Sequence, residues 1–257
     1  MAVLTLCSAS GAPGVTTSAF ALARVWHLAT GRSALLVDAD PVGSALIPAF
    51  AGAGIPTGGG VLAVAAERAS SADDILRRSV ALNDDAACLV LTGVTEPAQA
   101  RPLGAVWTTL IEAAHEFDGL GIDVLVDAGR LGHRWEPQPL IDAADVAVLV
   151  TRTSLSSAAL ARPGLAELAR RRPGGTPVRI LVVGRPSPYS PQEIAHALNA
   201  DALPELPDDA PGARALLLGE APSGRLGRSG LLRAARQTAA ALADTTATSR
   251  AGEVSVR

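Results

Sequence analysis

The sequence Gly11-Ala12-Pro13-Gly14-Val15-Thr16-Thr17 follows the apolar run Ala2–Ser8 and opens the stretch Val15–Thr30. Within that stretch, apolar residues recur at helical spacing, which predicts a helix with one face on a sheet: Ala19, Leu22, Ala23 and Trp26. A strand, a glycine turn and a helix N-terminus together make a phosphate cradle, because free backbone N–H groups and the helix dipole converge at one point. This stretch therefore predicts a strand–turn–helix unit that binds an anion.

Aspartates follow two later apolar runs. Asp38 comes directly after the run at 35–37 and Asp40 two positions later, and Asp127 comes directly after the run at 124–126. Carboxylates at the ends of such strands are typical magnesium ligands or orient a water molecule in phosphate-handling proteins. We therefore expect these aspartates to lie beside the glycine turn.

Strand-like and helix-like segments alternate along the rest of the chain. Further strands are expected at 33–38, 87–92, 122–127, 146–151 and 178–183, with a short edge strand at 202–207. Helices are expected at 72–79, 103–117, 154–172, 190–200, 211–218 and 227–244. This alternation predicts an α/β fold, a doubly wound and mostly parallel sheet with helices on both faces. We expect a single domain over residues 1–244 and a polar, disordered tail over 245–257.

Composition narrows the class of protein. The chain has 257 residues and a net charge of −3, which disfavours a globally basic nucleic-acid binder. Cys7 and Cys88 lie in apolar runs, as expected of reduced core residues in a cytoplasmic protein. No run reaches the roughly 18 apolar residues of a membrane span. All 22 basic residues are arginine, so the chain contains no lysine.

The glycine turn matches the general P-loop pattern, Gly-x-x-x-x-Gly-Lys-Ser/Thr, only in part. With Gly14 on the second glycine, Thr16 takes the Ser/Thr position, but Val15 takes the lysine and Ala9 the first glycine. Taken alone, this match favours a plain strand-to-helix turn. The later motifs add to it.

The order of the turn, Asp38-Ala39-Asp40-Pro41 and Ile122-Asp123-Val124-Leu125-Val126-Asp127 resembles the ParA/MinD family of P-loop ATPases. The segments 143–150, 206–209 and 219–222 are similar to later segments of that family, so the resemblance covers nearly the whole chain. It implies that ATP lies on the turn, with magnesium beside the strand-end aspartates. The residues it implies for ATP are Gly11, Gly14, Val15, Thr16 and Thr17, those for magnesium are Thr16, Asp38 and Asp127, and Asp40 would orient the attacking water.

The departures from the family pattern fall on its two lysines, whose positions hold Val15 and Ser10 here. A charge-assisted contact of lysine with phosphate is worth about 1.5–3 kcal/mol. Losing two of them weakens binding by roughly 10²- to 10⁴-fold. We therefore expect a degenerate member in which ATP and magnesium bind weakly or not at all. The aspartates are then inherited strand-end residues without a metal.

Three functions remain open on the sequence. The favoured one is a positioning or assembly factor with weak or no ATP hydrolysis, similar to atypical family members that help localise secretion or pilus machinery. The second is a working ATPase that partitions DNA or places cellular structures, with Arg130 in place of lysine. The third is a metabolic synthetase or kinase of the dethiobiotin or cobyrinic-acid type, which the missing lysine disfavours further.

Two surfaces are candidates for partners. The turn residues Ala9, Ser10, Ala12, Pro13 and Val15 are small or apolar, which predicts a homodimer or partner-protein contact independent of nucleotide. Arginines near the C-terminal helix favour a solvated helix face, with weak, non-specific DNA binding as the alternative: Arg225, Arg228, Arg233 and Arg236.

Overall fold

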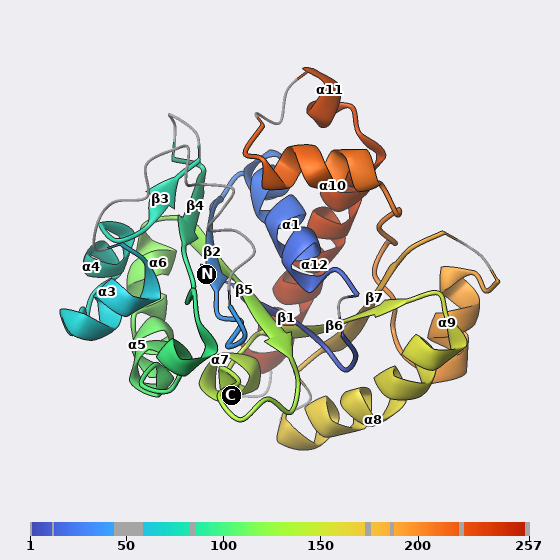
Figure 1. Ribbon diagram of the computed structural model, residues 1–257, viewed down its shortest axis with the longest axis horizontal. Coiled ribbons are helices and arrows are strands. Elements are labelled where there is room, and N and C mark those ends of the chain that lie inside the picture. Colours follow the sequence, from blue (N-terminus) through green and yellow to red (C-terminus); the bar gives the residue numbers. More distant parts are fainter. Residues whose placement is uncertain are drawn as a thin grey trace.

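The computed structural model describes residues 2–11, 13–43, 59–82, 86–172, 176–185, 188–220 and 224–254. A seven-stranded sheet of order β3-β4-β2-β5-β1-β6-β7 forms its centre (Figure 1). Every neighbouring pair is parallel except β3–β4. The strands are β1 Val3–Ser8, β2 Ser33–Asp38, β3 Val80–Ala81, β4 Cys88–Leu91, β5 Ile122–Arg130, β6 Val146–Arg152 and β7 Val178–Val183. The predicted α/β class with a mostly parallel sheet is confirmed.

Helices cover both faces of the sheet (Figure 1). One face carries α1 Val15–Thr30, α10 Ala210–Leu217, α11 Gly224–Gly227 and α12 Gly230–Val254. The other carries α3 Gly60–Ala66, α4 Ala72–Leu76, α5 Gly104–Glu112, α6 Ala114–Gly119, α7 Gln138–Asp142, α8 Leu155–Arg171 and α9 Pro191–Leu198. A short 3₁₀ helix, η1, spans Pro97–Ala100.

All six residues of the central strand β1 are buried, and all but Thr5 and Ser8 are apolar. Val3 and Cys7 point into the core under α3–α9, whereas Leu4 and Leu6 point into the core under α1 and α12. A strand that is covered on both faces favours apolar residues on both sides, because alternate side chains enter opposite cores. The buried hydroxyl groups of Thr5 and Ser8 donate to the carbonyls of Leu140 and Ser10. β1 lies between β5 and β6, so the glycine turn leaves the middle of the sheet.

Some predicted elements differ in extent. The helix expected at 103–117 is divided at Ala113 into α5 and α6. The edge strand expected at 202–207 is reduced to two bridges, from Ala202 and Leu206 to β7. Pro204 and Pro207 have no N–H to donate, so a continuous ladder cannot form there. The helices α3 and α7 and the strand β3 were not predicted.

The C-terminal helix is longer than the sequence predicted. It was expected to end at Asp244, with a disordered tail from 245, but α12 continues to Val254. Thr246 is buried, and the hydroxyl groups of Thr245 and Thr248 donate to the helix carbonyls of Ala241 and Asp244. These bonds satisfy the polar side chains within the helix, which is why a polar composition does not end it.

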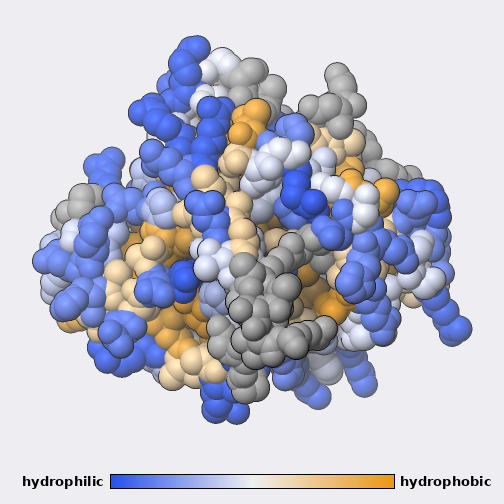
Figure 2. Space-filling view, turned by 180° about the vertical axis from the view of Figure 1, so that it is seen from behind, coloured by the Kyte–Doolittle hydropathy of each residue, from blue (hydrophilic) through white to orange (hydrophobic). Residues whose placement is uncertain are grey.

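Large apolar side chains reach the surface at scattered places. Seen from behind, hydrophobic surface lies in patches between hydrophilic ones (Figure 2). The exposed residues come from different parts of the fold and include Leu28, Val42, Leu120, Leu155, Leu160, Tyr189 and Leu218. Scattered apolar residues are normal on a protein surface and do not by themselves indicate a partner. None of the described helices is long and apolar enough to cross a membrane.

Candidate functional site

The glycine turn leads into an uncapped helix N-terminus. Gly14 has φ 104°, a left-handed conformation that favours glycine, and Ser18 N–H donates to its carbonyl in the first helical bond. Its N-cap residue, Gly14, has no side chain to cap the helix, and the first turn contains no acidic residue. The N–H groups of Val15, Thr16 and Thr17 therefore precede the first helical bond and suit an anion.

The two lysine positions are filled in different ways. Val15 is only 6% exposed and packs in the core under α1 and α12. The carbonyl of Ser10 accepts a hydrogen bond of 2.9 Å from the Ser8 hydroxyl. Burial stabilises an apolar valine, so its side chain enters the core rather than the cradle.

The apolar surface expected around the turn is accordingly smaller than predicted. Pro13 and Val15 are both buried by the chain itself, so the prediction is wrong for these two residues. Ala9 and Ser10 are half-buried and Gly11 is exposed, whereas Ala12 lies outside the described residues.

Asp127 is a buried carboxylate in β5, the strand next to β1, from which the glycine turn leaves. Its Oδ1 accepts the N–H of Gly129 at 3.0 Å, but its Oδ2 is buried without a hydrogen-bond partner among the described residues. Burial raises the pKa of Asp127 to about 6, and the charge of Asp40 adds to the rise, whereas hydrogen bonds from Thr16 and Gly129 oppose it. A proton or a cation at this position would stabilise the carboxylate.

Asp40 lies against the chain that follows Asp127. A Cβ placed on Gly129 would be 2.5 Å from the Asp40 carboxyl carbon, so only glycine leaves room for this side chain. Burial raises the pKa of Asp40, while a 2.9 Å bond from Val42 N–H and the charge of His133 lower it. The aspartate expected to orient water is thus held beside Asp127.

His133 is a site residue that the sequence did not reveal. It lies in the loop after β5, and its Nδ1 accepts the N–H of Trp135 at 3.1 Å. Its proximity to Asp40 follows from the path of this loop. The only sequence signal was its position shortly after Asp127, because the four histidines show no spacing of their own.

Asp38 completes the group predicted from the strand ends. It is buried and pairs in register with Asp127 across β2 and β5. A Cβ on Gly93 would be 2.9 Å from the Asp38 carboxyl carbon, so the chain after β4 packs directly on this carboxylate. The structure therefore brings Asp38, Asp127 and Thr16 together at the carboxyl edge of the sheet.

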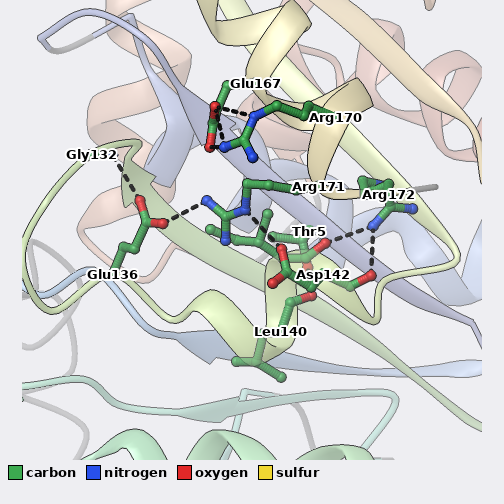
Figure 3. Close-up of polar contacts among 10 residues, drawn as sticks. Thr5, Gly132, Glu136, Leu140, Asp142, Glu167, Arg170, Arg171 and Arg172 are labelled. Atoms are coloured by element: carbon green, nitrogen blue, oxygen red, sulfur yellow. Dashed lines mark hydrogen bonds and ion pairs between the residues drawn. The ribbon is translucent and has the colours of Figure 1, made fainter.

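An ion-pair network fixes the loop that carries His133 (Figure 3). Arg171, at the end of α8, donates to Glu136 Oε1 at 2.6 Å and to Asp142 Oδ1 at 2.8 Å. Glu136 Oε2 in turn accepts the N–H of Gly132. Burial alone would lower the pKa of Arg171, but its bonds to Asp142 and Glu136 outweigh burial and raise the pKa. The neighbouring Arg172 donates to the carbonyl of Ile141 in α7 and to that of Ala144 just after this helix.

A small cavity lies beside the turn. It measures about 80 Å³, borders Gly14 and Thr17, and reaches Arg152 and Asp208, whose charged groups are 4.0 Å apart. Small-molecule pockets usually exceed about 300 Å³. This cavity is therefore smaller than a typical nucleoside pocket.

The residues fit magnesium and phosphate in part. The uncapped turn, Thr16 and the orphaned Oδ2 of Asp127 suit a metal-bound phosphate. In the described part of the chain, however, no three His, Cys, Asp or Glu side chains are placed to hold a metal ion, so phosphate and water oxygens would have to complete its coordination. Arg130 is exposed at the end of β5, with its backbone opposite Ser8.

The comparisons with known proteins support the fold. No protein-family model and no curated protein matches the chain. Among solved structures, MinD from Pyrococcus horikoshii complexed with Mg-ADP is 18% identical, with a TM-score of 0.74 over 96% of this chain and 98% of its own. A chain of the MinC:MinD cell division protein complex from Aquifex aeolicus is 20% identical, with a TM-score of 0.71 over 95% of this chain and 96% of its own.

A ParA-family ATPase from Chlorobium tepidum is 14% identical, with a TM-score of 0.70 over 94% of this chain and 98% of its own. These TM-scores establish the architecture, whereas sequence identities this low leave the activity open. On these grounds, the chain has the P-loop α/β fold of the MinD and ParA-family ATPases.

Proposed function

We propose that this chain is a degenerate ParA/MinD-like positioning or assembly factor that hydrolyses ATP weakly or not at all. It acts through contacts with a second copy of itself or with a partner protein. The observation that carries the proposal is the burial of Val15, which turns an apolar side chain into the core where the resemblance expects a phosphate-binding lysine. The absence of lysine from the whole chain leaves no replacement ammonium group.

The same site keeps part of a nucleotide cradle. Thr16, Asp38 and Asp127 would hold magnesium, the backbone of Gly11, Gly14, Thr16 and Thr17 would face the phosphates, and magnesium would neutralise phosphate charge. Asp40 would hold the attacking water, with its side chain packed against Gly129, and the charge of His133 lowers the pKa of Asp40. What the chain lacks is a lysine whose positive charge would face the transferring phosphoryl group. Stabilisation of that group's negative charge is the main source of catalysis in such sites.

The cellular setting belongs to the same proposal. Cys7 and Cys88 are buried and form no disulfide, which supports a reducing compartment, and we place the protein in the cytoplasm. Neighbours with this fold include MinD in a complex with MinC, which supports a partner-binding role for a chain whose catalytic charges are missing.

The test is ATP turnover at millimolar Mg-ATP, measured by phosphate release. We expect none above background. A turnover of about one per minute or faster, lost in Asp40→Ala, would overturn the proposal and support the working ATPase with Arg130 in the lysine's role; even this rate is far below typical kcat values.

Association is tested by light scattering with and without Mg-ATP. We expect a dimer or larger species in both conditions. Gly11→Arg adds a charge at an exposed turn position with open space and should weaken association, whereas Gly104→Arg adds the same charge on α5 and should not. A dimer that forms only with ATP would contradict a nucleotide-independent factor, and a monomer in every condition would leave only a partner protein for this face.

A further inference from the structure

A groove of about 660 Å³ runs between α10 and the segment formed by α11 and the start of α12. These elements lie at one end of the molecule (Figure 1). Its walls carry Arg214 from α10, Arg225 from α11 and Arg228 from the link to α12. This groove is separate from the small cavity beside Gly14, although Asp209 borders both.

The three arginines give the groove an excess of positive charge. All three are exposed, and none forms an ion pair with any residue that the structure describes. Two carboxylates border the groove, but the Asp209 oxygens accept the N–H groups of Gly212 and Leu231. Asp209 thereby caps α10 and contacts the N-terminus of α12. Among the residues that line the groove, Glu220 is the other carboxylate, and it caps neither helix.

The groove is also partly apolar. Leu218 is 63% exposed at its edge, and Leu226 and Ala215 contribute to its lining. Phosphate backbones are bound by cationic and polar donors, and an exposed leucine forms no favourable contact with them. A peptide that carries acidic and apolar side chains uses both features, because its carboxylates pair with guanidinium groups while an apolar residue covers Leu218.

Only two of the four arginines that the sequence grouped near the C-terminal helix line this groove. Arg225 and Arg228 line the groove with Arg214, which the sequence did not connect to them, whereas Arg233 and Arg236 lie on α12 outside the lining. A DNA surface along the C-terminal helix would use all four of the sequence-derived arginines. The groove instead depends on Arg214, a residue of another helix.

We propose that this groove binds an acidic peptide segment with an apolar side chain, supplied by a partner protein. The inference rests on the proposed function in so far as a positioning factor needs a partner. It names the chemistry of that partner and the surface that receives it.

The experiment uses fluorescence anisotropy of the full chain with a short labelled peptide built from glutamate, aspartate and leucine. We expect micromolar to millimolar binding that weakens with salt. Arg214→Gln and Arg225→Gln should each weaken binding about tenfold, equivalent to about 1.4 kcal/mol. Leu218→Ser should weaken it by a smaller factor, and Arg236→Gln, an equally exposed arginine outside the groove, should leave it unchanged.

Two further probes separate the rival sources of binding. A peptide with serine in place of leucine should bind more weakly, and equal binding would overturn the role of the apolar lining. Short duplex DNA should bind less tightly than the peptide. DNA binding that depends on Arg233 and Arg236 as strongly as on Arg214 would overturn the proposal in favour of a nucleic-acid surface.

The proposal also fails if the peptide does not bind at millimolar concentration, or if Arg236→Gln weakens binding as much as Arg214→Gln. These failures are distinguishable from failure of the proposed function. ATP turnover with intact peptide binding would overturn only the proposed function, and absence of peptide binding without turnover would overturn only the groove.

Discussion

The carboxylate of Asp40 lies directly against Gly129, so that a Cβ at position 129 would be 2.5 Å from the Asp40 carboxyl carbon. Gly129 follows Asp127 by two positions in β5, and its N–H donates to that aspartate. One glycine therefore sets the positions of both carboxylates, and its φ of 64° adds a left-handed conformation that other residues rarely adopt.

Gly129→Ala should displace Asp40 and lower the free energy of unfolding by about 2–4 kcal/mol, because a steric clash adds to left-handed strain. Urea denaturation measures this loss. Gly132→Ala is the matched control: its φ is 80° and a Cβ meets nothing within 4 Å, so it should cost only about 1 kcal/mol. Equal losses in the two variants would contradict the packing of Asp40 on Gly129.

Asp127 should make stability depend on pH. Because burial raises its folded pKa to about 6, the folded state binds the proton more tightly than the unfolded state. The stability contributed by this proton is present below about pH 4 and is lost as pH rises to about 6, up to about 3 kcal/mol in all. Asp127→Asn should remove this loss, so the variant should unfold at higher urea than wild type at pH 8. Parallel pH profiles for the two proteins would contradict the raised pKa.

Val15→Lys tests the cradle itself. We expect it to lower stability by about 1–3 kcal/mol, because a buried valine is lost from the core. It should also tighten Mg-ATP binding by about 10- to 100-fold through one charge-assisted phosphate contact. Val15→Met, a long side chain without charge, should show no gain in affinity. If calorimetry finds no gain for lysine in a folded variant, the turn is closed to phosphate.

Asp123 anchors the N-terminal strand to the rest of the fold. It is buried and accepts Ala2 N–H at 2.7 Å, Trp26 Nε1–H at 3.0 Å and Arg32 Nε–H at 3.0 Å. Asp123→Ala leaves these donors without an acceptor and should cost about 3–5 kcal/mol in urea denaturation. Asp118→Ala removes the other, half-exposed partner of Arg32 and should cost at most about 1 kcal/mol. Similar losses would show that Asp123 contributes no more than a surface pair.

Arg171→Met should loosen the loop that carries His133. The variant leaves Glu136 and Asp142 without their shared cation, and we expect a stability loss of about 1–3 kcal/mol, reduced by partial access of solvent. Amide hydrogen exchange should accelerate between Gly132 and Asp142. Arg170→Met removes the neighbouring, exposed pair with Glu167 and should change neither quantity. Unchanged exchange in Arg171→Met would mean that the loop is held by other contacts.

Three features could be predicted from the amino-acid sequence: the fold class, the strand–turn–helix unit at the N-terminus and the aspartates at the strand ends. These features depend on local spacing: apolar runs in strands that are covered on both faces, helical periodicity, and a glycine where φ is positive. The missing lysine was equally visible, because it is a property of composition.

The positions of the remaining side chains could not be predicted from the sequence, because they depend on the packing of distant segments. The burial of Val15, the contact of Asp40 with Gly129 and the charge of His133 nearby depend on segments far apart in the chain. The same holds for Arg171, whose partners come from the loop after β5 and from α7, and for Arg214 beside Arg225. Local pattern fixes which residues form a strand or a helix, whereas contacts across the sheet decide which side chains are buried, paired or exposed, because they depend on how distant elements pack.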